Sequence, residues 1–301
     1  MQSPPPVPLA IDRPAWFGPA WVLRGSVALL ALGIAASILP IFNTFSSTSK
    51  INSMLIEQCG VDDPTADAID TAAACIMLLI AVATLATRRS WPLLPLISLW
   101  LLVELLYRAL VDEVWHPELL PAESALRLLA PLALMLWLAR PRGTPLAIPA
   151  RRAQAVEWLL RIAIAATFAG HGMEALLARG HFVDLILAAT QHVPALQIGE
   201  SHARALLPLI GGVDLAVAVL ILVPRRWTWL VVWLTLWGLL TAASRIIFWD
   251  GLSRFDDTLT RMVHGGAPLA LLVWWRVSRQ PGTSRSAAPA ASPPGPVPPA
   301  S

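Results

Sequence analysis

A histidine and a glutamate lie inside a long apolar run, where ionisable side chains are rare. The run extends from Trp158 to Leu176 and carries His171 and Glu174 near its second end. Residues three apart share one face of a helix, so the imidazole and the carboxylate should lie side by side. Such a pair suits the exchange of protons or hydrogen bonds with a ligand. Because an ionisable group in a membrane-length apolar segment is costly, the pair predicts a functional site.

Further ionisable residues occur in the apolar runs that follow. Asp257, Arg261 and His264 have i, i+4, i+7 spacing, which places them on one helix face. His264 lies about as far from its helix end as His171 does, so we expect both at a similar depth. Polar pairs that fasten helices together are the competing interpretation for each residue taken alone. The candidate ligand-binding set is His171, Glu174, Asp214, Arg245, Arg261 and His264.

Two histidines on separate helices can also bind a haem iron from both sides. The glycines next to them could admit a porphyrin or could let neighbouring helices touch; these are Gly170, Gly172, Gly265 and Gly266. We favour touching helices, because Glu174 and Arg261 would bring extra charge beside an already anionic cofactor. Haem binding is therefore the less favoured interpretation.

Metal-binding and catalytic patterns are not evident in the sequence. Three further histidines, His181, His192 and His202, have irregular spacing near Asp184 and Glu200. They are interpreted as solvated loop residues, so no metal site is predicted. Hydrolase, metalloprotease, P-loop and dinucleotide-binding motifs do not occur in a suitable context. No catalytic residue is assigned, and whether the chain is an enzyme stays open.

The composition indicates the structure that must position these residues. Of the 301 residues, 56% are hydrophobic and 14% are charged, and the apolar residues fall in blocks of membrane-spanning length. Lys50 is the only lysine, so no polybasic nucleic-acid surface is expected. We predict an all-α integral membrane protein in a lipid bilayer. Its eight spans cover about 22–42, 69–87, 92–111, 123–139, 156–176, 205–223, 227–248 and 259–277.

An offset of 137 residues aligns the two halves of the chain without a gap. Trp21, Arg24, Arg108 and Trp137 then coincide with Trp158, Arg161, Arg245 and Trp274. We interpret this as a tandem repeat of a four-helix unit. The predicted organisation is an irregular leader (1–20), a first bundle (21–140), a cytoplasmic linker (141–154), a second bundle (155–278) and a disordered Pro/Ala/Ser tail (279–301).

The two copies differ where chemistry could lie. His171 and His264 of the second copy correspond to Ile34 and Arg127 of the first, whereas the first copy has its own intramembrane acid, Glu104. The second bundle is therefore expected to hold the specialised site. Arginines that recur in both copies are expected to serve the bundle itself.

The distribution of arginine predicts the orientation in the membrane. Arginines gather at alternate ends of the spans, and acidic residues gather at the opposite ends. The positive-inside rule then places both termini in the cytoplasm. Tryptophans near the arginine-rich ends are expected to be interfacial anchors; they are Trp21, Trp91, Trp137, Trp158, Trp227 and Trp274.

The second half, about 155–277, resembles the DoxX-like family of small four-helix bacterial membrane proteins. The resemblance is carried by Arg161, Phe168-Ala-Gly-His-Gly172, the Pro224-Arg225-Arg226 turn and Arg261-Met-Val-His264, although Ala175 stands where members often have lysine. It implies an inner-membrane accessory of quinone-linked redox metabolism, with a quinone or a membrane redox protein as partner. In outline a duplicated four-helix bundle is also similar to haem A synthase. A structural or small-solute transport role remains an alternative.

Overall fold

The computed structural model of the chain describes residues 18–39, 49–111, 116–139, 149–177, 180–191, 197–247 and 255–279. Regular structure within these ranges is entirely helical, which confirms the all-α prediction. The helices are α1 (Pro19–Ile38), α2 (Lys50–Glu57), α3 (Asp63–Ala86), α4 (Leu94–Leu110), α5 (Leu120–Leu138), α6 (Ala150–Leu176), α7 (Gly180–Gln191), α8 (Glu200–Leu222), α9 (Thr228–Ile247) and α10 (Phe255–Arg279), with 3₁₀ helices η2 (Arg88–Leu93) and η3 (Pro117–Leu119).

Six helical segments of the described chain are long and apolar enough to cross a membrane. They are α1, α3, η2 with α4, η3 with α5, α8 and α9. The helices α6 and α10 have 27 and 25 residues but carry more charged side chains. The predicted leader up to residue 17, the linker residues 141–148 and the tail from 280 lie outside the described residues. Residues 150–154 of the predicted linker already belong to α6.

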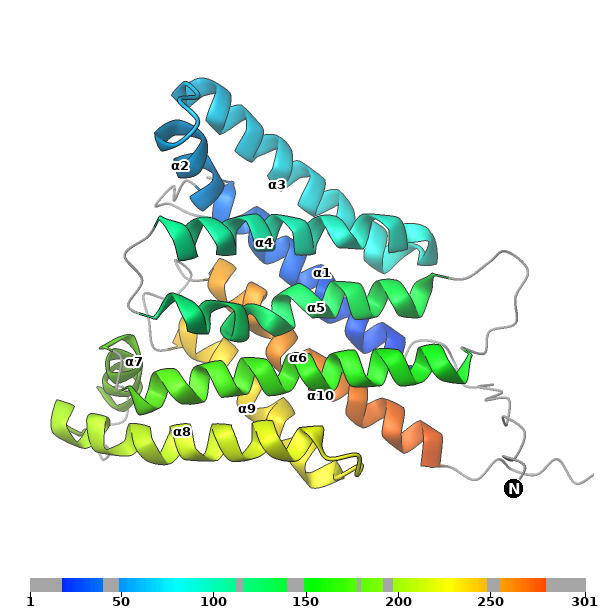
Figure 1. Cartoon of the computed structure of the whole chain (residues 1–301), viewed down its shortest axis with the longest axis vertical. Coiled ribbons are helices and arrows are strands. Elements are labelled where there is room, and N and C mark those ends of the chain that lie inside the picture. The colour runs from blue at the N-terminus through cyan, green and yellow to red at the C-terminus, as the bar shows by residue number, and fades with distance from the viewer. Residues whose placement is uncertain are drawn as a thin grey trace, which may run out of the picture.

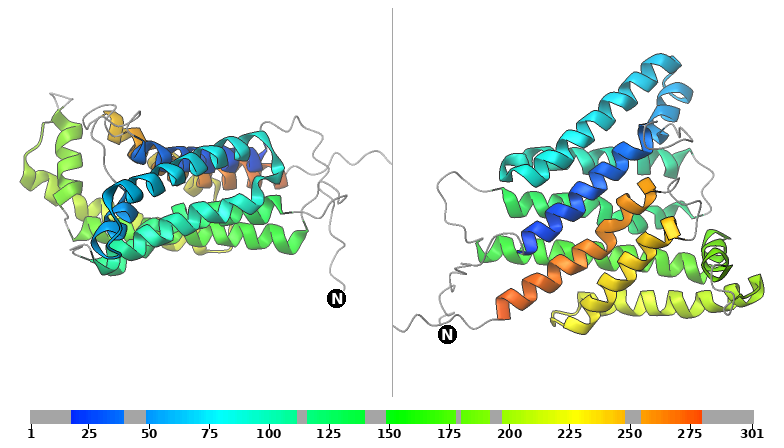
Figure 2. Two further views of the ribbon diagram at one scale, coloured as in Figure 1. Left: turned by 90° about the horizontal axis from the view of Figure 1, so that it is seen from above. Right: turned by 180° about the vertical axis from the view of Figure 1, so that it is seen from behind.

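The long helices lie side by side and alternate in direction (Figure 1). Seen from behind, α1, α9 and α10 lie in front of α5 and α6 (Figure 2). The largest packing surfaces join α1 to α10, α9 to α10, α5 to α6 and α6 to α8. The first helix of each predicted half thus packs on the last helix of the other half. The two halves interlock instead of standing beside one another.

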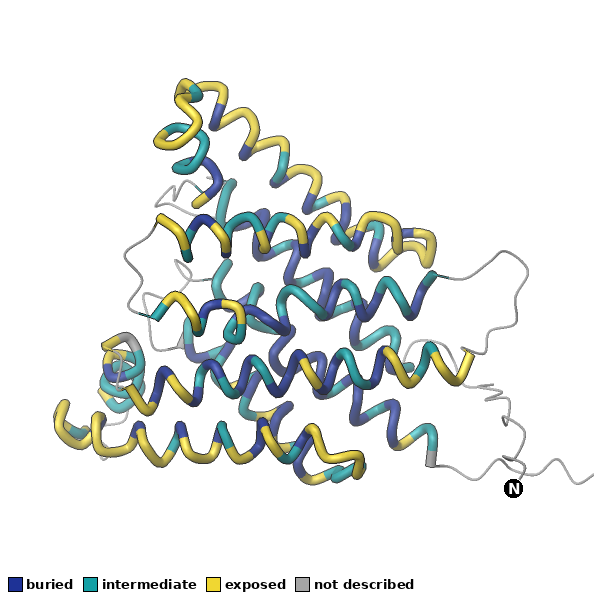
Figure 3. Tube along the Cα trace, in the orientation of Figure 1, coloured by how far each residue is buried: buried dark blue, intermediate teal, exposed yellow. Residues whose placement is uncertain are grey.

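Apolar side chains are exposed mainly on the outer helices. Large exposed apolar residues lie on α3, η2, α4, α6, α8 and α9, and within the described ranges none lies on α1, α5 or α10. The interior is filled by residues such as Leu30, Leu160, Ile164 and Leu271. Buried positions predominate along α1 and α10, and exposed positions along α3 and α8 (Figure 3). An apolar outer surface around a buried centre is what a helical protein presents to lipid. The environment indicated is a bilayer.

Two buried arginines make equivalent contacts in the two halves. The Nε atom of Arg24 donates to the Thr84 carbonyl oxygen at 2.6 Å, and an Nη of Arg161 donates to the Ile221 carbonyl oxygen at 3.1 Å. Each acceptor lies in the last turn of its helix, α3 or α8, where carbonyl groups lack intrahelical partners. A cation at a helix C-terminus also complements the helix dipole. The arginines therefore cap these helices.

Two glycines related by the 137-residue offset each lie very close to the backbone of a facing helix. A β-carbon on Gly33 would lie 2.7 Å from the backbone nitrogen of Thr260, and one on Gly170 would lie 2.7 Å from that of Glu123. Each glycine therefore lets a first helix touch the last helix of the other half. In both pairs the partners are related by the 137-residue offset.

Two short helices were not predicted from the sequence. The helix α2 is capped by Ser49, whose hydroxyl accepts a hydrogen bond from the Asn52 amide. The helix α7 contributes a second, smaller core with Val183. With 8 and 12 residues, neither has the length of a membrane span. His181 and His202 consequently lie on α7 and α8 and not in loops. His192 lies outside the described residues.

Candidate ligand-binding site

A cavity of about 730 Å³ lies between the helices where α6 ends and α10 begins. This volume falls within the ordinary range of small-molecule sites. The cavity brings together all six residues of the sequence-derived set: His171, Glu174, Asp214, Arg245, Arg261 and His264. Their role in binding stays a prediction, but their proximity is a property of the fold. Apolar side chains of Leu101, Phe168, Phe182, Leu207 and Trp237 complete part of the wall.

His171 stands at the centre of the polar contacts. Its Nδ1 atom lies 3.4 Å from Oε2 of Glu174, whose side chain is 3% exposed. The His171 ring also meets the His264 ring, with centroids 5.7 Å apart and planes inclined by 59°. The edge of Phe182 faces the same imidazole at 6.3 Å. The expected pairing of His171 with Glu174 at i, i+3 is present, and the rings of the two histidines lie next to each other.

The basic residues of the site share an acidic neighbour. The Nε atom of Arg245 lies 3.7 Å from an oxygen of the Asp257 carboxylate. The Nε atom of Arg261 lies 3.4 Å from the other oxygen. His264 is 5% exposed, and its Nε2 atom is buried without a hydrogen-bond partner in the described part of the chain. Asp214 is also buried and lies on α8, whose Gly211 packs against Gly172 of α6.

The first half of the chain contributes residues that the sequence analysis did not assign to the site. Glu104, Arg108, Glu123 and Arg127 line the same cavity from α4 and α5. The site is therefore shared by both halves and is not confined to the second one. The repeat alignment, which pairs Arg127 with His264, was the sequence signal for these residues. Their proximity to the site could be seen only from the packing of α5 on α6.

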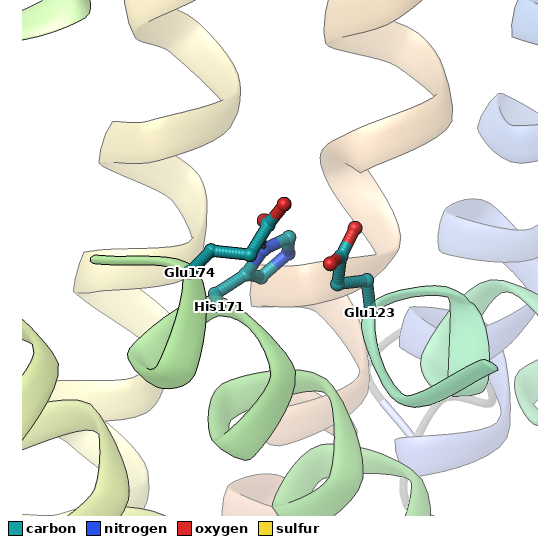
Figure 4. A group of neighbouring side chains, drawn as sticks. All are labelled: Glu123, His171 and Glu174. Atoms are coloured by element: carbon teal, nitrogen blue, oxygen red, sulfur yellow. Dashed lines mark hydrogen bonds and ion pairs between the residues drawn. The ribbon is translucent and has the colours of Figure 1, made fainter. Parts of the chain in front are cut away.

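Glu123 approaches the histidine and glutamate of α6 most closely. Potential ligand atoms of Glu123, His171 and Glu174 all lie within 4.8 Å of one another. Figure 4 shows the three side chains gathered around one space, with Glu123 projecting from α5 and the other two from α6. Residues 48 positions apart in the sequence thus form one polar cluster.

The glycines near the two histidines are used for helix contact. A β-carbon on Gly170 would meet the backbone of Glu123, and one on Gly265 would lie 2.5 Å from Leu239 Cγ. Gly172 packs on Gly211, and Gly266 packs on Ser26. These positions therefore bring helices together, as the sequence analysis favoured.

The polar residues of α7 and of the start of α8 do not join the cavity. Asp184, Glu200 and His202 are exposed, and Glu200 pairs with Arg204 at 2.8 Å. The side chain of His181 lies outside the described residues.

Comparison of the chain with protein-family models, with curated proteins and with solved structures finds no match. The resemblance of residues 155–277 to the DoxX-like family therefore stays a prediction.

Proposed function

We propose that the chain is a multi-pass membrane protein that binds a small, lipid-soluble ligand in the cavity shared by its two halves. The observation that carries this proposal is the convergence of ionisable side chains from α4, α5, α6, α8, α9 and α10 on one partly apolar cavity. Ionisable groups inside a bilayer are expensive, and several of them around one space favour a ligand over simple helix fastening. The resemblance to the DoxX-like family points to a quinone and to an accessory role in quinone-linked redox metabolism.

A quinone has a chemistry that matches this lining. Its flat ring suits the aromatic and aliphatic wall formed by Phe168, Phe182 and Trp237, and its carbonyl oxygens need hydrogen-bond donors. His171 would exchange hydrogen bonds or protons with the ligand, and Glu174 would orient the imidazole. Arg245 would balance the negative charge of a reduced ring.

The proposed architecture has eight spans in two related halves. The helices α6 and α10 are long enough to cross, and the burial of Arg161, Glu174 and His264 keeps their polar groups away from lipid. The duplication is supported by the matched capping contacts of Arg24 and Arg161 and by the matched glycine approaches.

The proposed location is the bacterial inner membrane with both termini in the cytoplasm. The chain enters α1 and leaves α5 at the end that also carries the α3–α4 and α8–α9 turns (Figure 1). Those turns contain Arg88, Arg89, Arg225 and Arg226, so arginine is concentrated on one side. This asymmetry supports a cytoplasmic assignment of that side.

Mass spectrometry of lipids that co-purify with the full chain from native membranes tests the function. We expect a quinone in the wild-type protein and its loss in His171→Ala and Glu174→Ala. His202→Ala is the matched control, because His202 is exposed on α8 outside the cavity and should retain the quinone. Quinone recovery that survives both cavity variants would contradict the site. Absence of quinone from folded wild-type protein would contradict the ligand class.

A further inference from the structure

The cluster of Glu123, His171 and Glu174 offers the donor set of a metal centre. Two carboxylates and an imidazole converge from α5 and α6, with ligand atoms within 4.8 Å of one another (Figure 4). Metal–ligand bonds of about 2.0–2.2 Å place ligand atoms roughly 3–4 Å apart, so small side-chain rotations would close the set around an ion.

A second observation points to the same ion. His264 lines the cavity on α10, is 5% exposed, and leaves its buried Nε2 atom without a hydrogen-bond partner in the described residues. A buried polar atom without a partner is costly unless a ligand supplies one. Its ring lies next to that of His171, at a centroid distance of 5.7 Å. His264 is not part of the set whose ligand atoms lie within 4.8 Å of one another, so its imidazole would have to turn toward His171 to join the same ion.

The charge of the cavity also fits a cation. Six acidic and four arginine side chains line it, which leaves a formal charge of −2 when the histidines are neutral. Two of the arginines, Arg245 and Arg261, are drawn toward Asp257. A single divalent ion would neutralise the net charge of −2 that these side chains leave in the cavity.

We propose that Glu123, His171 and Glu174 bind one divalent transition-metal ion, with His264 as the fourth donor. Mixed carboxylate and imidazole donors select Mn²⁺, Fe²⁺ or Zn²⁺. The sequence analysis predicted no metal site, because Glu123 lies in the other half of the chain and has no characteristic spacing from His171. This inference does not depend on the proposed quinone, since the donors are complete without it.

Zn²⁺ titration of the full chain in detergent tests the proposal, using an affinity tag without histidine and protein stripped with chelator. We expect one Zn²⁺ per chain by calorimetry and by elemental analysis. Co²⁺ should give d–d absorption bands that Zn²⁺ displaces. Binding of Zn²⁺ should also raise the melting temperature, because the ion binds the folded state.

Variants that each remove one donor identify the ligands. Glu123→Gln, Glu174→Gln and His171→Gln should each lower the Zn²⁺ affinity at least about tenfold. Loss of a residue that merely hydrogen-bonds to a metal ligand already lowers metal affinity about 10–100-fold. Asp184→Asn removes an exposed acid of α7 outside the cavity and should leave the affinity unchanged. If one variant fails to fold, the other two variants and the wild-type Co²⁺ spectrum still test whether the cluster binds the metal. Absence of stoichiometric Zn²⁺, Mn²⁺ and Fe²⁺ binding to the wild type, or equal affinity in all folded variants, would overturn the proposal.

Discussion

Trp137 and Trp274, which are 137 positions apart, pack on each other with ring centroids 4.6 Å apart. Each is 7% exposed, so the prediction that these two tryptophans are interfacial anchors is wrong. If the halves are repeats as proposed, two residues related by the 137-residue offset that touch each other lie near the axis relating the copies. The contact thus supports an arrangement in which α5 and α10 meet at the centre of the molecule.

The capping arginines provide a first test of the duplication. Arg24→Ala and Arg161→Ala should each destabilise the protein by about 1–2 kcal/mol, because last-turn carbonyls lose a cationic donor. Arg161→Ala should cost more, since Glu157 and Trp275 also contact Arg161. Melting in a single detergent provides the measurement, and the exposed Arg225→Ala serves as control. A large loss at one arginine with none at the other would contradict equivalent roles.

The close glycine approaches yield a second prediction. Gly33→Ala and Gly170→Ala should each destabilise by about 1–3 kcal/mol, because the added methyl meets backbone atoms of the facing helix. Gly25→Ala on α1 meets nothing within 4 Å and should instead stabilise by about 1 kcal/mol through helix propensity. Thermal melting of the three variants checks both signs. Equal behaviour of Gly25 and Gly33 would show that the α1–α10 contact is absent.

Cysteine labelling tests the orientation. Cys59 is exposed between α2 and α3, and Cys75 is exposed on α3 at mid-span. In a Cys75→Ser chain, an impermeant maleimide should label Cys59 from outside intact cells. In a chain lacking both native cysteines, Arg89→Cys and Arg225→Cys should react only after permeabilisation. Ser90 would be a poor probe, because it is 2% exposed. Labelling of Arg89→Cys in intact cells would reverse the assignment.

The haem alternative has a spectroscopic test. We expect the purified protein to be colourless, because Gly170 and Gly265 hold helices in contact beside the histidines. An absorption spectrum of protein from haem-replete cells is sufficient. A Soret band that disappears in His171→Ala but persists in His202→Ala would place haem above the quinone.

The long helices could be predicted because apolar blocks of membrane length leave little ambiguity. For example, the expected 227–248 corresponds to α9 at Thr228–Ile247. The short helices α2 and α7 were not predicted, because they are shorter than a membrane span. The contribution of the first half of the chain to the cavity was also not predicted, since the repeat alignment says which residues are equivalent but not which helix faces meet. Glu123 joins His171 only because α5 packs on α6 across the two halves.

The packing of α1 on α10 has a consequence for how the protein is made. The ribosome delivers α1 first and α10 last, so α1 enters the membrane long before its principal neighbour exists. Until then Gly33 faces no partner, although Arg24 can already find the end of α3. The contact between α1 and α10 therefore cannot form until residues 255–279 have been synthesised, and a nascent chain cut before residue 255 would leave α1 without its principal packing partner.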